Sequence, residues 1–234
     1  MNAPAIIKGA GPVYHAELHQ GSDEWLAARC GLLTASEMKL ILTPTLKVAS
    51  NDKSRAHLWE LLAQRTTGYV EPHYISDDML RGIDDEFEAR KLYAEHFAPV
   101  ETVGFITNDK WGFTIGYSPD GLVGDDGLIE CKSRRQKFQI QTIASRECPD
   151  DFWLQVQTGL LVSERKWLDF VSYSGGLPMF VHRVEADEET QEAIVAAATD
   201  FEDRLADAER EYRASLATMP KIIPTERRIQ EMFV

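Results

Sequence analysis

The residues with the clearest chemical pattern are two carboxylates and an ammonium close together in the sequence. Asp120 lies in an Asp-Gly turn between two β-prone segments, and Glu130 and Lys132 are two residues apart on the second segment. Side chains two apart on a strand point to the same face. Two carboxylates at one point repel each other unless a cation joins them, and Mg²⁺ prefers such oxygen ligands. The pattern therefore predicts a magnesium site beside a lysine, suited to hydrolysis of a phosphate ester.

An alternative for this triplet is a surface hairpin with solvated charges, because Asp-Gly is a common turn signal. Two features favour the chemical interpretation. The segment 127–132 is otherwise apolar, so its two charges are not expected to be free in solvent. The stretch 131–146 also has no acidic residue and carries five basic ones, which are Lys132, Arg134, Arg135, Lys137 and Arg146.

The elements that must position these residues alternate between helices and strands. Capping patterns and apolar periodicity predict helices over residues 22–31, 34–42, 54–67, 77–97, 134–146, 151–163 and 187–216. Short β-prone segments predict strands over 102–108, 112–117, 127–132, 167–173 and 179–184. This order predicts an α/β protein with a central mixed β-sheet flanked by helices. We expect one domain over 1–234, with a core over about 17–184 and a C-terminal helical segment over about 187–230.

The net charge argues at first against a nucleic-acid partner. The chain of 234 residues has 38 acidic and 25 basic side chains, a formal net charge of −13. Neutralising phosphates requires Lys and Arg. However, residues 185–213 hold 11 acidic and three basic side chains, so much of the negative charge belongs to the expected C-terminal helix. The basic stretch 131–146 next to the predicted magnesium site is consistent with DNA as a substrate.

The sequence has no feature of an exported or membrane protein. Its three cysteines, Cys30, Cys131 and Cys148, form no CxxC pair, so neither a zinc site nor a disulfide scaffold is predicted. The longest purely apolar run, Ala193–Ala198, is much shorter than the roughly 20 residues of a membrane-spanning helix. The N-terminus lacks a signal peptide pattern. We expect a cytoplasmic protein with no membrane partner.

Five ordered motifs connect the chain to a known family. They are Gln20-Gly-Ser-Asp-Glu-Trp25 with Arg29 and Thr34-Ala-Ser-Glu37, Gly82 with Glu86-Phe-Glu-Ala-Arg90, Ser118-Pro-Asp-Gly121, Glu130-Cys-Lys132, and Gln155-Val-Gln157. In order and spacing they resemble the motifs of the lambda exonuclease and YqaJ-type viral recombinase family, over roughly residues 17–175. The resemblance implies a PD-(D/E)xK restriction-endonuclease-like core.

The resemblance also implies which residues hold the metal. Asp120, Glu130 and the backbone carbonyl of Cys131 would bind Mg²⁺, with Mn²⁺ as a substitute, and Lys132 would complete the catalytic set. A helix glutamate assists a second metal position, and the motif register assigns this role to Glu86. Glu88 competes for it, because two residues apart on a helix the two cannot face the same way. The alternative for Glu86 is a solvated helix face.

A pocket for the 5′-phosphate of the degraded strand is implied as well. Its residues would be Arg29, Ser36, Ser118 and Gln155, with Lys132 nearby. Arginine offers a planar fork of donors to phosphate oxygens, and a serine at a helix start lies where free N–H groups favour an anion. The alternatives are a surface arginine and a serine that only caps its helix. The tryptophans, Trp25 among them, are interpreted as core or subunit contacts.

The resemblance therefore predicts a Mg²⁺-dependent 5′→3′ exonuclease acting on double-stranded DNA ends. It would release 5′-mononucleotides and leave a 3′ single-stranded overhang for phage-type homologous recombination in a bacterial host cell. The family works as a homotrimeric ring and passes the exposed strand to a single-strand annealing protein. Three alternatives remain, namely a related endonuclease, a non-catalytic DNA-end-binding protein and a hydrolase of another phosphate ester. No base-reading element of a restriction enzyme is identified.

Overall fold

The computed structural model describes residues 11–72 and 76–227, and residues 1–10, 73–75 and 228–234 lie outside the described part of the chain. The predicted domain over 1–234 and its C-terminal segment over 187–230 therefore include undescribed residues. The elements, with a 3₁₀ turn at Ala35–Glu37, are β1 (Val13–His15), α1 (Asp23–Arg29), β2 (Leu33–Thr34), α2 (Met38–Ile41), α3 (Asp52–Thr67), α4 (Asp77–His96), β3 (Phe105–Asn108), β4 (Ile115–Tyr117), β5 (Gly121–Val123), β6 (Gly127–Ser133), α5 (Gln136–Ser145), α6 (Asp150–Ser163), β7 (Trp167–Tyr173), β8 (Phe180–Glu185) and α7 (Glu188–Thr218).

The strands form two four-stranded sheets in the described residues, ordered β1-β3-β4-β2 and β5-β6-β7-β8. β6 and β7 run parallel, with Glu130 opposite Phe170, while β5 and β8 run antiparallel to their neighbours. A parallel pair needs a crossover connection, which α5 and α6 provide. The expected α/β class with helices around mixed sheets is confirmed.

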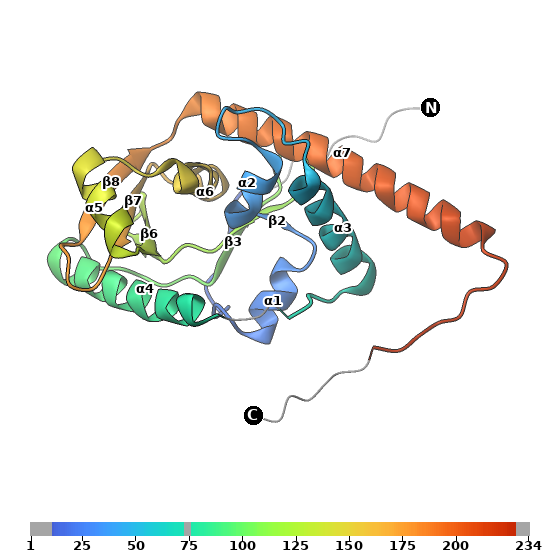
Figure 1. Ribbon diagram of the computed structural model, residues 1–234, viewed down its shortest axis with the longest axis horizontal. Helices are drawn as coiled ribbons and strands as arrows, with labels where there is room; N and C mark the ends of the chain where they lie inside the picture. The colour runs from blue at the N-terminus through green and yellow to red at the C-terminus, as the bar shows by residue number, and fades with distance from the viewer. Residues whose placement is uncertain (1–10, 73–75, 228–234) are drawn as a thin grey trace.

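Helix α6 explains why the strands divide between two sheets instead of forming one. It contacts β3 and β4 of the first sheet and β7 of the second, and it lies in the middle of the molecule (Figure 1). Its buried residues, Leu154 and 156–163, cover all sides of the helix. A helix that is buried on all sides needs a packing partner on each side, and the two sheets are among its partners.

Helix α4 packs on the outer face of β6 and β7. Ala89 and Tyr93 are buried there against a cluster that includes Ile129, Cys131 and Val171. The contact has a polar centre, because the Tyr93 hydroxyl donates to Asp169 Oδ2 at 2.6 Å. α4 is therefore attached to the sheet that carries the predicted metal ligands.

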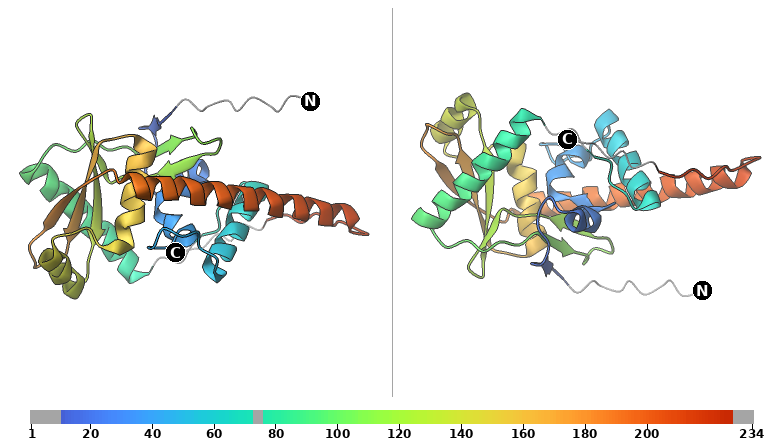
Figure 2. Two further views of the ribbon diagram at one scale, coloured as in Figure 1. Left: turned by 90° about the horizontal axis from the view of Figure 1, so that it is seen from above. Right: turned by 90° about the horizontal axis from the view of Figure 1, so that it is seen from below.

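Helix α7 has a buried half and an exposed half. Its buried residues run from Thr190 to Ala208, and beyond them the helix extends away from the body of the molecule (Figure 2). None of the acidic side chains of residues 185–213 is buried, so the negative charge predicted for this segment lies on the surface. In the described part of the chain, the length and apolar content needed to cross a bilayer are not found in any helix.

Candidate active site

Eight of the predicted site side chains line one hollow of about 180 Å³. They are Arg29, Ser36, Glu86, Ser118, Asp120, Glu130, Lys132 and Gln155. They come from α1, the 3₁₀ turn, α4, the segment between β4 and β5, β6 and α6. The Cys131 side chain is buried on the other side of β6, in the cluster beneath α4. Its thiol is outside the hollow, and the role of its backbone carbonyl stays a prediction.

Glu130 has three hydrogen-bond donors around its carboxylate. Lys132 Nζ lies 2.7 Å and Gln155 Nε2 lies 2.5 Å from Oε1, and the Tyr117 hydroxyl donates to Oε2 at 2.7 Å. The Glu130 side chain is only 3% exposed. Strand alternation puts Glu130 and Lys132 on one face of β6, as predicted, while α6 brings Gln155 to them.

Hydrogen bonds to the side chain and the main chain hold the turn that contains Asp120 in place. The N–H of Cys131 donates to Asp120 Oδ2 at 2.6 Å, which ties the turn to β6. Arg90 on α4 donates to the Asp120 carbonyl at 3.3 Å, and Gln20 donates to the Pro119 carbonyl at 2.9 Å. The carboxylate of the turn and the carboxylate of the strand are thereby brought to the same hollow.

The two glutamates that compete for the α4 role have different surroundings. Glu86 lines the hollow, whereas Glu88 is 49% exposed and lies 3.9 Å from Lys91. A hydrogen bond from the Ser133 hydroxyl to Asp85 on α4, at 2.5 Å, holds this part of α4 against the end of β6. Of the two, Glu86 is the residue whose position fits a ligand.

The carboxylates of the hollow carry more negative charge than their surroundings balance. Burial and the neighbouring Glu130 raise the pKa of Asp120 well above its ordinary value. Burial also raises the pKa of Glu86, with a further contribution from Glu130. Burial alone would lower the pKa of Lys132, but Glu130 and the other carboxylates outweigh it and raise this pKa, so the lysine is an ammonium.

This donor set fits a divalent cation held by two carboxylates and the main chain. Hard oxygen atoms with unbalanced charge are suitable ligands for Mg²⁺. In the part of the chain that the structure describes, no three His, Cys, Asp or Glu side chains already form a metal-binding cluster. The fit therefore rests on Asp120 and Glu130 with the carbonyl of Cys131, the set that the resemblance implies, and not on three side chains.

The residues predicted to bind a phosphate surround Arg29. Its guanidinium donates to Ser118 Oγ and Thr34 Oγ1, each at 3.3 Å, and Thr34 in turn contacts Ser36 at 3.3 Å. Arg29 also lies 4.4 Å from the centre of the Trp25 ring. Burial lowers the pKa of Arg29, which indicates a cation that lacks full compensation. An anion in the hollow would supply it.

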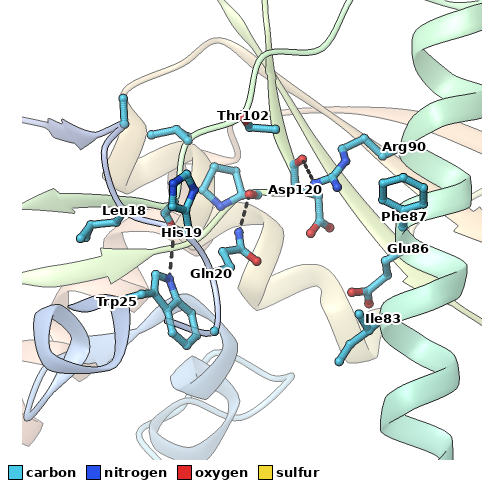
Figure 3. Close-up of a pocket in the computed structure, with 15 residues that line it drawn as sticks. Leu18, His19, Gln20, Trp25, Ile83, Glu86, Phe87, Arg90, Thr102 and Asp120 are labelled. Atoms are coloured by element: carbon cyan, nitrogen blue, oxygen red, sulfur yellow. Dashed lines mark hydrogen bonds between the residues drawn. The ribbon is translucent and has the colours of Figure 1, made fainter. Parts of the chain in front are cut away.

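A larger hollow of about 510 Å³ adjoins the first. The two share Gln20, Trp25, Glu86 and Asp120. Figure 3 shows Glu86 on α4 facing Asp120 across this space, with Ile83 and Phe87 on the same helix. Ile83 and Phe87 are 61% and 57% exposed. The carboxylates therefore lie between a small polar hollow and a wider one with apolar walls.

Two residues of the site were missed or interpreted differently from the sequence. Tyr117 was not singled out, although it directly precedes the Ser118 motif and donates to Glu130. Trp25 supports the predicted phosphate pocket, because its indole N–H lies 3.0 Å from both Ser118 Oγ and the Gly104 carbonyl. Its position four residues before Arg29 on α1 puts both on one helix face, which was an available signal.

Comparison with known proteins gives one family and several similar structures. Residues 24–166 match the model of the YqaJ-like viral recombinase domain. An alkaline exonuclease of Laribacter hongkongensis is 32% identical, covering 83% of this chain and 100% of that one with a TM-score of 0.69, and its complex with dAMP gives 33% identity, the same coverage and 0.70. A phage-related exonuclease of Haemophilus somnus (15% identity, 76% and 96% coverage, TM-score 0.52) shares the fold. The curated proteins contain no match.

Proposed function

The chain belongs to the YqaJ-like viral recombinase family, and from this premise we propose that it is a Mg²⁺-dependent 5′→3′ exonuclease acting on double-stranded DNA ends. Its similarity to an alkaline exonuclease supports hydrolysis of DNA from an end. The observation that carries the proposal is the meeting of Asp120, Glu130 and Lys132 in one hollow beside Arg29. A surface hairpin with solvated charges would not bring these four side chains together.

The contacts of each residue support the catalytic roles that the resemblance implies. Asp120, Glu130 and the Cys131 carbonyl would hold Mg²⁺, or Mn²⁺ in its place, with Glu86 as a further ligand. The bound ion supplies charge stabilisation and an activated water for phosphodiester hydrolysis. Lys132 is an ammonium at the edge of this group, where it stabilises the negative charge that develops on the phosphoryl oxygens. Tyr117 and Gln155 keep the Glu130 carboxylate oriented through their hydrogen bonds.

Recognition of a 5′-phosphate is the basis of the proposed polarity. The Arg29 fork and the hydroxyls of Ser36 and Ser118 match the oxygens of a terminal phosphate. Since the carboxylates adjoin this pocket, a strand held there by its 5′-phosphate presents its first phosphodiester for cleavage. The products are 5′-mononucleotides and a 3′ single-stranded overhang. The adjoining hollow with its apolar walls is suited to the sugar and base of the terminal nucleotide.

The oligomer and the partner belong to the same proposal. The resemblance implies a homotrimeric ring around DNA, an annealing protein that receives the 3′ strand, and recombination in the cytoplasm of a bacterial host. The charge distribution supports it, because an acidic outer helix and a basic stretch beside the site favour binding along one track. Light scattering of the purified protein should give three times the monomer mass. A mass equal to one monomer would contradict the proposed homotrimeric ring.

The decisive assay compares DNA ends and metals. Linear duplexes with a 5′-phosphate or a 5′-hydroxyl are incubated with Mg²⁺ or with EDTA, beside a closed circle. We expect mononucleotides from the linear DNA only, faster with the phosphate, and no product in EDTA. Cleavage of the closed circle would assign an endonuclease, and binding of ends without cleavage would assign a DNA-end-binding protein.

Arg29→Gln tests the polarity separately. The variant should narrow the difference in rate between phosphorylated and hydroxyl ends, because the phosphate loses its bidentate partner. Arg213→Gln on the exposed half of α7 is the matched control, since it removes the same charge from a side chain that is 75% exposed. An unchanged difference in the Arg29 variant would refute the 5′-phosphate pocket.

A further inference from the structure

Arg134 continues the face of β6 that carries the active-site charges. Glu130, Lys132 and Arg134 follow at intervals of two, and strand alternation gives such residues a common face. Although β6 ends at Ser133, the extended pairing goes on, because the Arg134 N–H donates to the Tyr173 carbonyl of β7 at 2.7 Å. The side chain therefore leaves the sheet on the same side as Lys132.

The cations of Lys132 and Arg134 both lie near the ring of Phe152. The Arg134 guanidinium lies 5.0 Å from the centre of the Phe152 ring, and Lys132 Nζ lies 5.8 Å from the same centre. The two cations are thus at most about 11 Å apart. Phosphates of one DNA strand follow each other at about 3.4 Å along the helix axis. A strand with one phosphate at Lys132 therefore has another within reach of Arg134.

Aromatic rings hold the guanidinium in place, and within residues 11–72 and 76–227 no hydrogen bond of the Arg134 side chain is found. A second ring, Phe138, lies 5.2 Å from it. Arg134 Nε is buried and has no hydrogen-bond partner, and no ion pair of its side chain is found in the described residues. Buried polar groups normally have partners, and a structural arginine normally donates to a carbonyl or carboxylate. In the described residues Arg134 has no such partner, and the charge of Asp151 on α6 only partly offsets the burial that lowers the pKa of Arg134.

We propose that Arg134 binds a backbone phosphate of the degraded strand, next to the phosphodiester that is cleaved. The inference rests on the proposed nuclease function and deepens it by assigning a substrate contact. Stacking on Phe138 and Phe152 fixes the plane of the guanidinium, so its fork is oriented before DNA arrives. Contact with a phosphate carries no base specificity, and it holds the strand in register for hydrolysis.

Binding without cleavage provides the first test. The full-length protein is titrated with a 5′-phosphorylated duplex in Ca²⁺, over a range of salt concentrations. For Arg134→Gln we expect weaker binding and a salt dependence of log Kd that is lower by about one, the signature of one lost phosphate contact. Arg134→Lys, which keeps the charge, should retain most of the slope, and Arg213→Gln should behave as wild type. An unchanged slope in Arg134→Gln would overturn the assignment.

A scan of single methylphosphonates locates the contact. Each duplex has one neutral linkage among the first phosphates of the degraded strand. In the wild type, one position beside the scissile linkage should weaken binding, and Arg134→Gln should lose its sensitivity at that position only. A profile identical to wild type, or an equal change at all positions, would exclude a specific contact.

Hydrolysis of bis(p-nitrophenyl) phosphate separates this role from catalysis or folding. That compound has a single phosphodiester and no neighbouring phosphate. Arg134→Gln should keep the wild-type rate on it while KM for duplex DNA rises; equal losses on both substrates would overturn the proposal. If the wild type binds duplex ends but cleaves none, the proposed nuclease function fails, and the binding profiles still decide the Arg134 contact.

Discussion

Asp169 on β7 and the carboxylates of Glu130 and Asp120 beside β6 are compensated very differently. Asp169 on β7 accepts Nε and Nη2 of Arg183 at 2.8 and 2.9 Å, in addition to the Tyr93 hydroxyl. On β6, Glu130 shares Lys132 with Asp120, and burial leaves the pKa of Asp120 raised. The first carboxylate is satisfied by the chain itself, whereas burial leaves the second group under-compensated, and for this group we propose a cation from outside.

This difference in charge compensation distinguishes a carboxylate with a structural role from carboxylates that are proposed to bind a metal. A carboxylate that accepts two bonds from one arginine and a third from a hydroxyl has its charge balanced by its own side-chain partners. Asp169 therefore attaches α4 to the sheet, and its partner Arg183 is further fixed 3.6 Å above the Trp167 ring. Under the proposed function, the under-compensated carboxylates would lower stability in the absence of metal and would favour its binding. The following changes break or sharpen this contrast.

Lys132→Met should have the largest effect. It removes the ammonium that stabilises developing negative charge, so kcat on linear duplex should fall roughly 10²–10³-fold, as for loss of one electrostatic donor in an enzyme site. Binding to ends in Ca²⁺ should remain measurable. Circular dichroism checks that the variant is folded, and a kcat within tenfold of wild type would remove Lys132 from the mechanism.

Asp169→Ala should reduce stability and leave the chemistry of the folded protein intact. The substitution leaves the Tyr93 hydroxyl without its hydrogen-bond acceptor and Arg183 without its ion-pair partner. We expect a loss of about 2–3 kcal/mol in the free energy of unfolding, below the roughly 3–5 kcal/mol of a fully buried pair, because Arg183 is half exposed to solvent. Urea denaturation measures it. A normal unfolding midpoint with abolished turnover would place Asp169 in the active site instead.

Gly159→Ala tests how closely α6 must approach the site. A Cβ at Gly159 would lie 2.7 Å from the ring of Tyr117, the residue that donates to Glu130. Despite the better helix propensity of alanine, we expect a loss of about 1–2 kcal/mol from overpacking, with a lower kcat. Gly82→Ala on α4, which has open space around it, is the control and should be neutral or stabilising.

Asp120→Asn should change the free energy of unfolding least, and it should increase stability where Asp169→Ala and Gly159→Ala decrease it. A carboxyl whose pKa is raised by folding stabilises the protein below its ordinary pKa near 3.8, and this contribution is lost as pH rises through the folded value of about 8. Without metal, the variant should therefore be more stable than wild type by about 1 kcal/mol near neutral pH, and more so at pH 8 than at pH 5. Thermal unfolding in EDTA measures the difference, and a wild type that gains stability across this range would contradict it.

Much of the secondary structure and of the site followed from local patterns. The capping residues of α1 and of the 3₁₀ turn, and the apolar periodicity of α3 and α4, located these helices to within a few residues. Asp120, Glu130 and Lys132 were reached from strand alternation and the turn, which act over short distances, and the other site residues were implied by the resemblance to the family. Their catalytic roles remain predictions.

The remaining features depend on contacts distant in sequence. β2 and β5 are two and three residues long, too short for an alternating pattern to identify them. Division into two sheets depends on how α6 packs, which its composition does not specify. Tyr117 and Gly159 pack closely together although they are 42 residues apart in the sequence. Local sequence patterns cannot predict a contact over that separation.

The position of β6 in its sheet has a consequence for synthesis of the chain. Until β7 has been made, the strand carrying Glu130 and Lys132 lacks its parallel partner, and until α6 has been made Gln155 is missing from the carboxylate. The ribosome therefore has to complete more than two thirds of the polypeptide before a competent site can assemble. We therefore expect a translation product that ends before β7 to lack the assembled site and to leave DNA uncut.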